Sequence, residues 1–214
     1  MDKFRLHYFP ESGNSYKLAL MLRLCGKPFE LVWVDFLGGE TRKPSWREAV
    51  NEMGEVPVLE HGTSRLTQTA PILLRLSERF GQFGAASKEQ HYELLRWLFW
   101  DNHKLTSYLA TYRFMRAFTR NPDPSVLNFM RSRVDAALAI AERRLERHNF
   151  VLGVGMSIAD ISMCAYLSYP AEETGYELPQ SHPATWAWLQ RIANAPGWLP
   201  PYELLPGQRF RNPV

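Results

Sequence analysis

A run of short polar residues, PESGNS at positions 10–15, lies between the first predicted strand and the first predicted helix. The hydroxyl of Ser12 or the amide of Asn14 could donate a hydrogen bond to a bound thiol. Such a bond favours the thiolate, because a hydrogen bond to the charged form stabilises that form and lowers the pKa of the thiol. An ordinary thiol has a pKa of about 8.5 and is mostly protonated at neutral pH. The simpler interpretation is a polar turn in which Ser15 caps the helix, and the run alone does not exclude it.

A second candidate site is the sequence GEVPVL at residues 54–59. A proline at the start of a strand cannot donate to the sheet and is best placed at an edge. If the Val56–Pro57 bond is cis, the backbone of Val56 turns outward. Its N–H and C=O groups could then pair with an extended peptide by strand addition. A plain proline at the entry to a strand is the alternative.

A third candidate is LTQTAPI at residues 66–72, at a predicted strand-to-helix junction. Thr69 can serve as the N-cap, and Pro71 then lies in the first turn, where its missing N–H costs nothing. Gln68 can both donate and accept hydrogen bonds toward the ammonium and carboxylate of an amino acid. The start of a helix also attracts anions. An ordinary helix cap is again the alternative.

Hydrophobic periodicity supplies the elements that would position these residues. The first half predicts the order βαβαββα, and its opening βαβ unit implies a parallel pair of strands. The expected strands are 4–8, 29–34, 56–59 and 65–67, and the expected helices begin near 15, 45 and 69.

The pattern then becomes helical throughout, after a linker of small residues at 82–87. One long helix is expected over 89–118 and a second ends near 145, with shorter helices at 157–167 and 183–195. Ser157 and Asp160 predict a capping box at the start of the helix expected over 157–167. We therefore expect two domains, an α/β domain at 1–82 and an all-α domain at 88–214.

Four stretches in order, YFPESGNSYKLAL, GEVPVL, LTQTAPILLRL and SIAD, resemble the cytosolic glutathione S-transferase superfamily over essentially the whole chain. The resemblance implies a thioredoxin-like domain followed by a helical domain that carries a hydrophobic co-substrate site. The SGNSYK run is similar to the serine/asparagine loop of theta-like and nu-like bacterial members. No cysteine lies in this loop, which argues against the types that form a mixed disulfide with glutathione.

The resemblance also implies roles for individual residues. Ser12, with Asn14, would stabilise the thiolate of glutathione, although Tyr8 matches the tyrosine of other classes. The tripeptide would be bound by Lys43, Val56, Pro57, Gln68 and Thr69. The co-substrate pocket would be walled by Tyr108, Tyr112 and Met115, for which a place in the core is the alternative. Asp101 would reach the glutathione bound to a neighbouring subunit.

The implied function is that of a glutathione S-transferase, which transfers the thiolate of glutathione to a hydrophobic electrophile in a detoxifying reaction. A glutathione-dependent disulfide or peroxide reductase and a non-catalytic interaction module are the alternatives. The resemblance further implies a homodimer.

Composition narrows the range of possible partners and cofactors. The 214 residues are 45% hydrophobic and 22% charged with a net charge of +3, which is typical of a globular protein. The charges are interleaved, so we expect neither nucleic acid nor a membrane as partner. The six histidines lack metal-ligand spacing, and we expect no metal. Met1 leads directly into strand-like sequence without a signal segment, so a cytoplasmic location is expected.

Overall fold

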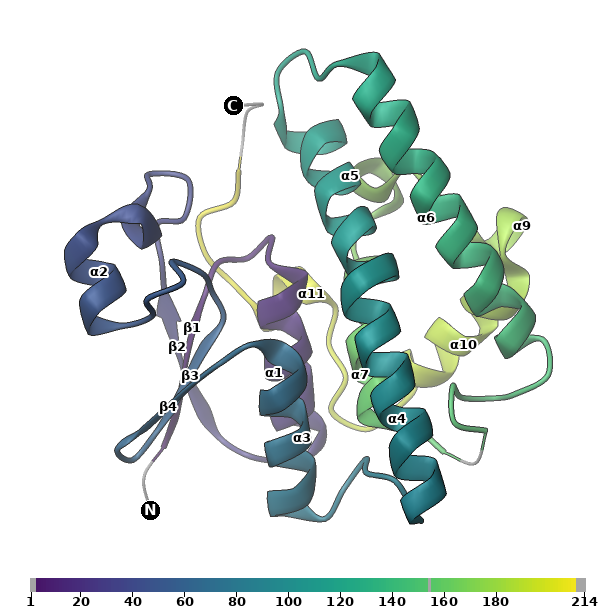
Figure 1. Ribbon diagram of the computed structural model, residues 1–214, viewed down its shortest axis with the longest axis horizontal. Coiled ribbons are helices and arrows are strands. Elements are labelled where there is room, and N and C mark those ends of the chain that lie inside the picture. The colour runs from purple at the N-terminus through teal and green to yellow at the C-terminus, as the bar shows by residue number, and fades with distance from the viewer. Residues whose placement is uncertain (1–2, 154, 211–214) are drawn as a thin grey trace.

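The computed structural model describes residues 3–153 and 155–210 (Figure 1). A four-stranded mixed sheet lies at the centre of the N-terminal half, with its strands in the order β2-β1-β3-β4. The strands β1 and β2 are parallel, whereas β3 is antiparallel to both β1 and β4. Their bounds are β1 Phe4–Tyr8, β2 Phe29–Trp33, β3 Val58–His61 and β4 Ser64–Thr67.

Helices cover both faces of this sheet. Helices α1 (Gly13–Leu24) and α3 (Thr69–Phe80) lie between the sheet and the helical half of the molecule (Figure 1). Helix α2 (Pro44–Ala49), preceded by the 3-10 turn η1 (Glu40–Arg42), lies on the other side. A small separate core of Val34, Trp46 and Val58 is formed there. Helices thus pack against both faces of the sheet, and its most buried strand is the central β1.

The C-terminal half is entirely helical. Its first two helices, α4 and α5, are joined by a π-helical turn, η2, so the single helix expected over 89–118 is interrupted near its middle. A long helix, α6, follows α5, and shorter helices complete the half. The bounds are α4 Lys88–Trp100, η2 Asp101–Leu105, α5 Thr106–Phe118, α6 Pro124–Leu145, α7 Ile158–Leu167, α8 Ala171–Thr174, α9 Leu178–Ser181, α10 Pro183–Ala193 and α11 Pro201–Leu204.

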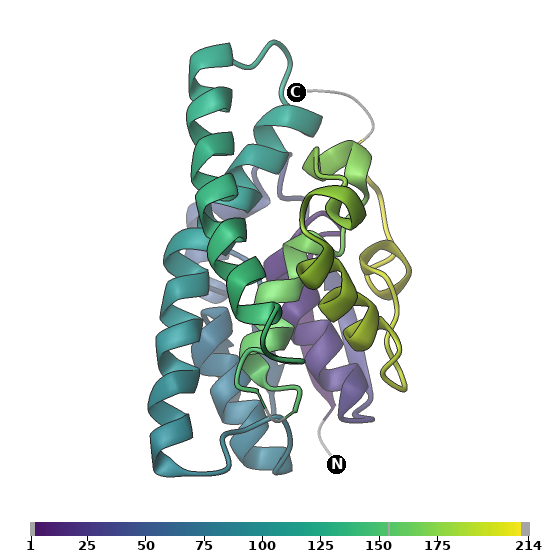
Figure 2. The same ribbon diagram turned by 90° about the vertical axis from the view of Figure 1, so that its right-hand side faces the viewer.

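Helix α7 is the centre of the packing between the two halves. All ten of its residues are buried, and it lies across α1 (Figure 2). Its start is fixed by the predicted capping box, because the N–H and hydroxyl of Ser157 both donate to Asp160. The same carboxylate accepts from Val151 N–H and Trp188 Nε1. A buried carboxylate with four donors can anchor a helix in the middle of a core.

The expected fold class is confirmed: a thioredoxin-like domain with a mixed four-stranded sheet is followed by an all-helical domain. The third strand begins at Val58 rather than Val56. The one-turn helices α8, α9 and α11 were not expected, because four residues are too few for a helical period. Among the helices formed by the described residues, none has both the length and the apolar character that spanning a bilayer needs.

The chain after α10 returns to the N-terminal domain (Figure 1) and lies along one side of the molecule (Figure 2). The carbonyl oxygen of Leu199 accepts a hydrogen bond from Tyr16, and that of Pro206 accepts one from Tyr8. We refer to residues 199–210 as the C-terminal segment. It is part of the wall between the domains.

We expect Gly13→Ala to destabilise the protein, although alanine is normally the better helix former. A Cβ at Gly13 would lie 2.5 Å from the ring of Tyr166 on α7, which is closer than real Cβ atoms approach. Overpacking of this kind costs about 2 kcal/mol. Urea denaturation would measure the free energy of unfolding. Gly155→Ala is the matched control, because its Cβ would have open space. An equal effect of the two substitutions would contradict the close approach of α1 and α7.

Candidate active site

The loop between β1 and α1 places Ser12 at the N-cap of α1. The Ser12 Oγ accepts a hydrogen bond from Ser15 N–H at 3.0 Å, so the alternative in which Ser15 caps the helix is wrong. Within the described part of the chain no acceptor is found for the Ser12 hydroxyl proton. The Ser12 side chain is 3% exposed. It can therefore donate to a ligand that enters the loop while it continues to cap the helix.

A polar pocket lies beside this helix start. The Val56–Pro57 bond in its wall is cis, as expected. Val56 precedes β3 and belongs to none of the strand pairs of the sheet. The pocket is lined by Asn14, Asn51, Glu55, Val56, Pro57, Gln68, Thr69 and Asn102. Five of the residues expected to bind or activate glutathione thus meet in one place. Ser12 is not among the lining residues and lies two residues before Asn14.

Asn14 presents an unused hydrogen-bonding group at this pocket. Its Oδ1 is buried and has no hydrogen-bond partner among residues 3–153 and 155–210. Buried polar atoms are normally satisfied, so an orphan beside a pocket requires an explanation. A ligand carrying a donor would satisfy it.

Gln68 and Thr69 occupy the opposite wall, at the start of α3. Gln68 is the N-cap, with φ of 67°, so the prediction that Thr69 caps this helix is wrong. A positive φ at a residue other than glycine is rare and is tolerated chiefly at functional sites. The Gln68 amide donates to the Glu55 carboxylate at 3.0 Å, which fixes its orientation. The uncapped N–H groups at the start of this twelve-residue helix favour a carboxylate.

Three residues that line the pocket were not expected from the sequence: Asn51, Glu55 and Asn102. Asn51 donates to the carbonyl of Glu55 and accepts from Met53 N–H, and so shapes the turn before Val56. Asn102 comes from the π-helical turn η2 of the helical domain. The apolar period of residues 89–118 gives no sign of this turn.

The turn η2 is anchored by a buried ion pair. Lys17 Nζ lies 3.0 Å from Asp101 Oδ2, and both side chains are almost completely buried. Thr106 and Ser162 donate to the same carboxylate at 2.8 and 2.5 Å. The expected contact of Asp101 with a second subunit is wrong, because its oxygens are already bound inside its own chain. Asp101 instead fixes the turn that brings Asn102 to the pocket.

Tyr8 lies close to this loop in sequence, but its hydroxyl is engaged elsewhere. The side chain is buried, and its O–H donates to the carbonyl of Pro206 in the C-terminal segment. Burial raises the pKa of Tyr8. The arrangement favours Ser12 and Asn14 over Tyr8 as donors to a thiolate.

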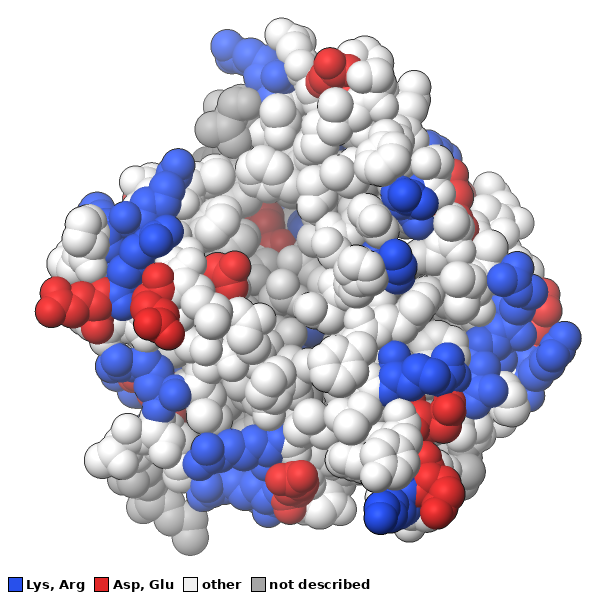
Figure 3. Space-filling view, in the orientation of Figure 1, with Lys and Arg blue, Asp and Glu red and all other residues white. Residues whose placement is uncertain are grey.

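The remaining expected site residues do not line the pocket. Lys43 is exposed at the N-cap of α2. Tyr112 is buried in the helical core, where its ring packs against Tyr176. Tyr108 lies under the guanidinium of Arg133. Met115 is partly buried on α5. A hollow between the two domains is visible on the face shown in Figure 3.

Comparison with known proteins identifies the family of this chain. The family profile for the glutathione S-transferase N-terminal domain matches residues 12–79, and that for the C-terminal domain matches residues 105–196. A crystal structure of a glutathione S-transferase from Pseudomonas fluorescens is 31% identical, with a TM-score of 0.82. The alignment covers 92% of this chain and 98% of that one. The chain belongs to the glutathione S-transferase family.

More distant members of the family differ in activity. Glutathione S-transferase F14 of Arabidopsis thaliana is 28% identical over 92% of this chain and 82% of its own length. The disulfide-bond oxidoreductase YfcG of Escherichia coli is 25% identical over 83% of this chain and 91% of its own. Family membership therefore leaves the reaction open.

We expect Asp101→Asn to destabilise this glutathione S-transferase family member strongly. Without the carboxylate, Lys17 remains buried and unpaired, which costs about 3 kcal/mol or more. Chemical denaturation would measure the loss. Glu93→Gln breaks the exposed Arg96–Glu93 pair and serves as the control, with an expected change below about 1 kcal/mol. If the two losses were similar, the buried pair would not anchor η2.

Proposed function

We propose that this protein is a glutathione S-transferase that binds glutathione in the pocket beside Val56, stabilises its thiolate and transfers it to a hydrophobic electrophile. The observation that carries the proposal is the meeting of Asn14, Val56, Gln68 and Thr69 in one polar pocket at two helix starts. A detoxifying role would follow from such a reaction.

In the proposed complex, glutathione lies extended across the pocket. Its cysteinyl backbone pairs with the N–H and C=O of Val56, next to Pro57. Its γ-glutamyl carboxylate is held by Thr69, Gln68 and the start of α3, where the helix dipole favours an anion. Lys43, which lies outside the pocket, would reach the glycine end only through its flexible side chain.

The thiol then lies near the N-terminus of α1. Ser12 donates its hydroxyl proton to the sulfur, and the amide N–H of Asn14 provides a second donor. Both bonds are stronger to a thiolate than to a thiol, so they lower the thiol pKa. The nucleophile belongs to glutathione, and the protein supplies activation and orientation. The co-substrate would approach from the helical domain, where Tyr108 and Met115 are proposed contacts.

A second candidate is glutathione-dependent reduction of a disulfide or peroxide at the same site. It is supported by the similarity to the E. coli disulfide-bond oxidoreductase. The same thiolate would attack one sulfur of the disulfide, whose other sulfur leaves as a thiolate when the S–S bond breaks, or one oxygen of the peroxide, whose O–O bond breaks and releases the other oxygen. A non-catalytic interaction module is the third candidate. An orphan oxygen on Asn14 beside an open pocket argues against it, since a scaffold has no need of one.

Glutathione titration by calorimetry, followed by turnover assays with an aryl halide and with a small disulfide, separates these candidates. Binding with either activity supports an enzyme, and the preferred substrate identifies the reaction. Absence of binding at millimolar glutathione would overturn the proposal and favour the interaction module.

We also propose a homodimer that uses the first long helix. Tyr92 and Phe99 on α4 are 62% and 71% exposed and lie seven residues apart, on the same helix face. Burial of two such aromatic rings would favour association. Sedimentation velocity would test this, and a monomer at micromolar concentration would contradict it.

Ser12→Ala and Asn14→Ala are expected to lower kcat by about 10²-fold, because each removes a donor to the thiolate. In Ser12→Ala, glutathione affinity should change by less than about threefold, since the Asn14, Val56 and α3 contacts remain. Ser12→Ala also removes a helix cap, worth about 1 kcal/mol. Ser12→Asp keeps a cap but places a negative charge beside the sulfur, so it should retain stability and lose turnover.

Ser132→Ala is the control for these variants, because its hydroxyl lies on the exposed surface of α6. Unchanged turnover in Ser12→Ala would leave Asn14 as the activating group. Unchanged turnover in both variants would reject the assignment.

Asn102→Ala should weaken glutathione binding about fivefold, because we propose that the Asn102 amide forms one hydrogen bond with the bound tripeptide. The exposed Asn128 on α6 offers a matched control of the same residue type. Calorimetry with S-methylglutathione measures the affinity without any contribution from thiol ionisation. Equal affinities of the two variants would show that η2 does not contribute to binding.

A further inference from the structure

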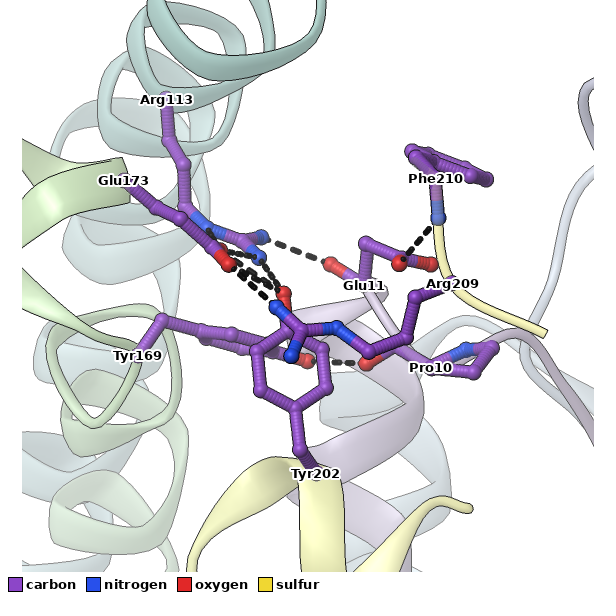
Figure 4. A network of polar contacts seen from close by, with 8 residues as sticks. All are labelled: Pro10, Glu11, Arg113, Tyr169, Glu173, Tyr202, Arg209 and Phe210. Atoms are coloured by element: carbon purple, nitrogen blue, oxygen red, sulfur yellow. Dashed lines mark hydrogen bonds and ion pairs between the residues drawn. The ribbon is translucent and has the colours of Figure 1, made fainter. Parts of the chain in front are cut away.

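The helical domain holds the backbone of the loop that carries Ser12. Tyr169 donates its hydroxyl to the carbonyl of Pro10 at 2.8 Å, and Arg113 Nη1 donates to the carbonyl of Glu11 at 2.8 Å (Figure 4). Tyr169 is 4% exposed and Arg113 is 2% exposed. The two carbonyls belong to the two residues immediately before Ser12, so both donors act on the approach to the proposed thiolate site.

The direction of Arg113 is fixed by its own surroundings. Its Nε donates to the Glu173 carboxylate at 2.9 Å, and Nη2 donates to the same carboxylate and to the hydroxyl of Tyr202. The guanidinium carbon lies 3.6 Å from the centre of the Tyr169 ring. A planar group held by an ion pair on one edge and a ring on one face has little freedom to turn.

The C-terminal segment closes this network into a ring of contacts. Arg209 donates to Glu173 at 2.8 Å, and Phe210 N–H donates to the Glu11 carboxylate at 2.8 Å (Figure 4). Arg209 also lies over the ring of Tyr202. The loop is thus held at its backbone from the helical domain and at the Glu11 side chain from the C-terminal segment. We call Arg113, Tyr169, Glu173, Tyr202 and Arg209 the loop clamp.

The loop clamp is distinct from the other contacts that join the two domains. Lys17 with Asp101, and Gly13 against Tyr166, already fix α1 to the helical domain. The clamp acts one step earlier in the chain, on two carbonyls with no role in α1 itself. Donors to a developing charge lose most of their effect when they move by about 1 Å, so the position of this loop is chemically important.

We propose that Arg113 and Tyr169 are positioning residues for thiolate formation, and that the C-terminal segment completes the clamp which holds the Ser12–Asn14 segment against Val56. This rests on the proposed function for its catalytic consequence. The clamp makes no contact with glutathione in this proposal. Its loss should therefore impair thiol ionisation and leave affinity for the tripeptide intact.

Tyr169→Phe tests the proposal with the least disturbance, because it deletes one hydroxyl and keeps the ring beneath Arg113. Tyr176→Phe is the matched control. Tyr176 is a buried tyrosine of the same domain, and its hydroxyl donates to Asp135 instead of the loop. The melting temperature should decrease by a similar amount in the two variants. The variants should differ only in measurements that report on the loop.

In Tyr169→Phe we expect the acid limb of the kcat/KM profile to move to a pH about 0.5 higher, since weaker donors raise the thiol pKa. The turnover number near pH 6.5 should fall about threefold or more, while S-methylglutathione affinity stays within about twofold. Hydrogen exchange of the peptide spanning residues 9–14 should accelerate in Tyr169→Phe and stay unchanged in Tyr176→Phe. Arg113→Lys should show the same changes, because a single ammonium cannot reproduce the forked contacts.

The outcomes separate this inference from the proposed function. If the unaltered protein neither binds nor turns over glutathione, the function fails, yet hydrogen exchange still tests the clamp. If the unaltered protein is active and Tyr169→Phe matches Tyr176→Phe in pH profile and in exchange, the clamp is rejected. Faster exchange with an unchanged pH profile would also reject it as a positioning device for catalysis.

Discussion

The burial of Lys17 opposite Asp101 is the constraint on which the site depends. A charged ammonium in the core requires a charged and fully hydrogen-bonded partner. The partner, Asp101, lies in the other domain. It is the first residue of the π-helical turn η2, which joins α4 to α5. This single pairing fixes α1, which begins at the Ser12 loop, relative to η2, which carries Asn102. The two domains are therefore joined through the same residues that shape the pocket between them.

Most of the fold could be predicted from the sequence because local patterns and tertiary packing agree. The alternation at Phe4–Tyr8 gave a strand with the same bounds in the structure. The capping box at Ser157 gave the start of α7. The π-turn could not be predicted, since the apolar period continues through it and Lys17, which pairs with Asp101 at its first residue, lies far away in sequence. The one-turn helices near the C-terminus have no period at all.

The site was predictable where a backbone conformation restricts residue type. Pro57, Gln68 and Thr69 are short-range signals of a strand entry and a helix start, and they meet in the pocket. Asn51 and Asn102 carry no such signal, because an asparagine on a helix or a turn is unremarkable until a neighbouring element makes it part of a wall. The last residues of the chain engage the hydroxyl of Tyr8 through its bond to the Pro206 carbonyl, which no pattern near Tyr8 could predict.

That dependence on the C-terminal segment has a structural consequence. The segment occupies the hydroxyl of Tyr8, approaches Pro10 closely at Gly207, and stacks Phe210 on Phe9 with the two rings 5.7 Å apart. It also packs Phe210 against Phe118 at the end of α5. The loop that would activate a thiol, near the N-terminus, is thus covered by residues from the C-terminal segment. A tyrosine-based mechanism would need this segment to leave, whereas a serine- or asparagine-based one operates with it in place. With the C-terminal segment packed in this way, the hydroxyl of Tyr8 is engaged, whereas the side chains of Ser12 and Asn14 are not bound by the segment, residues 199–210.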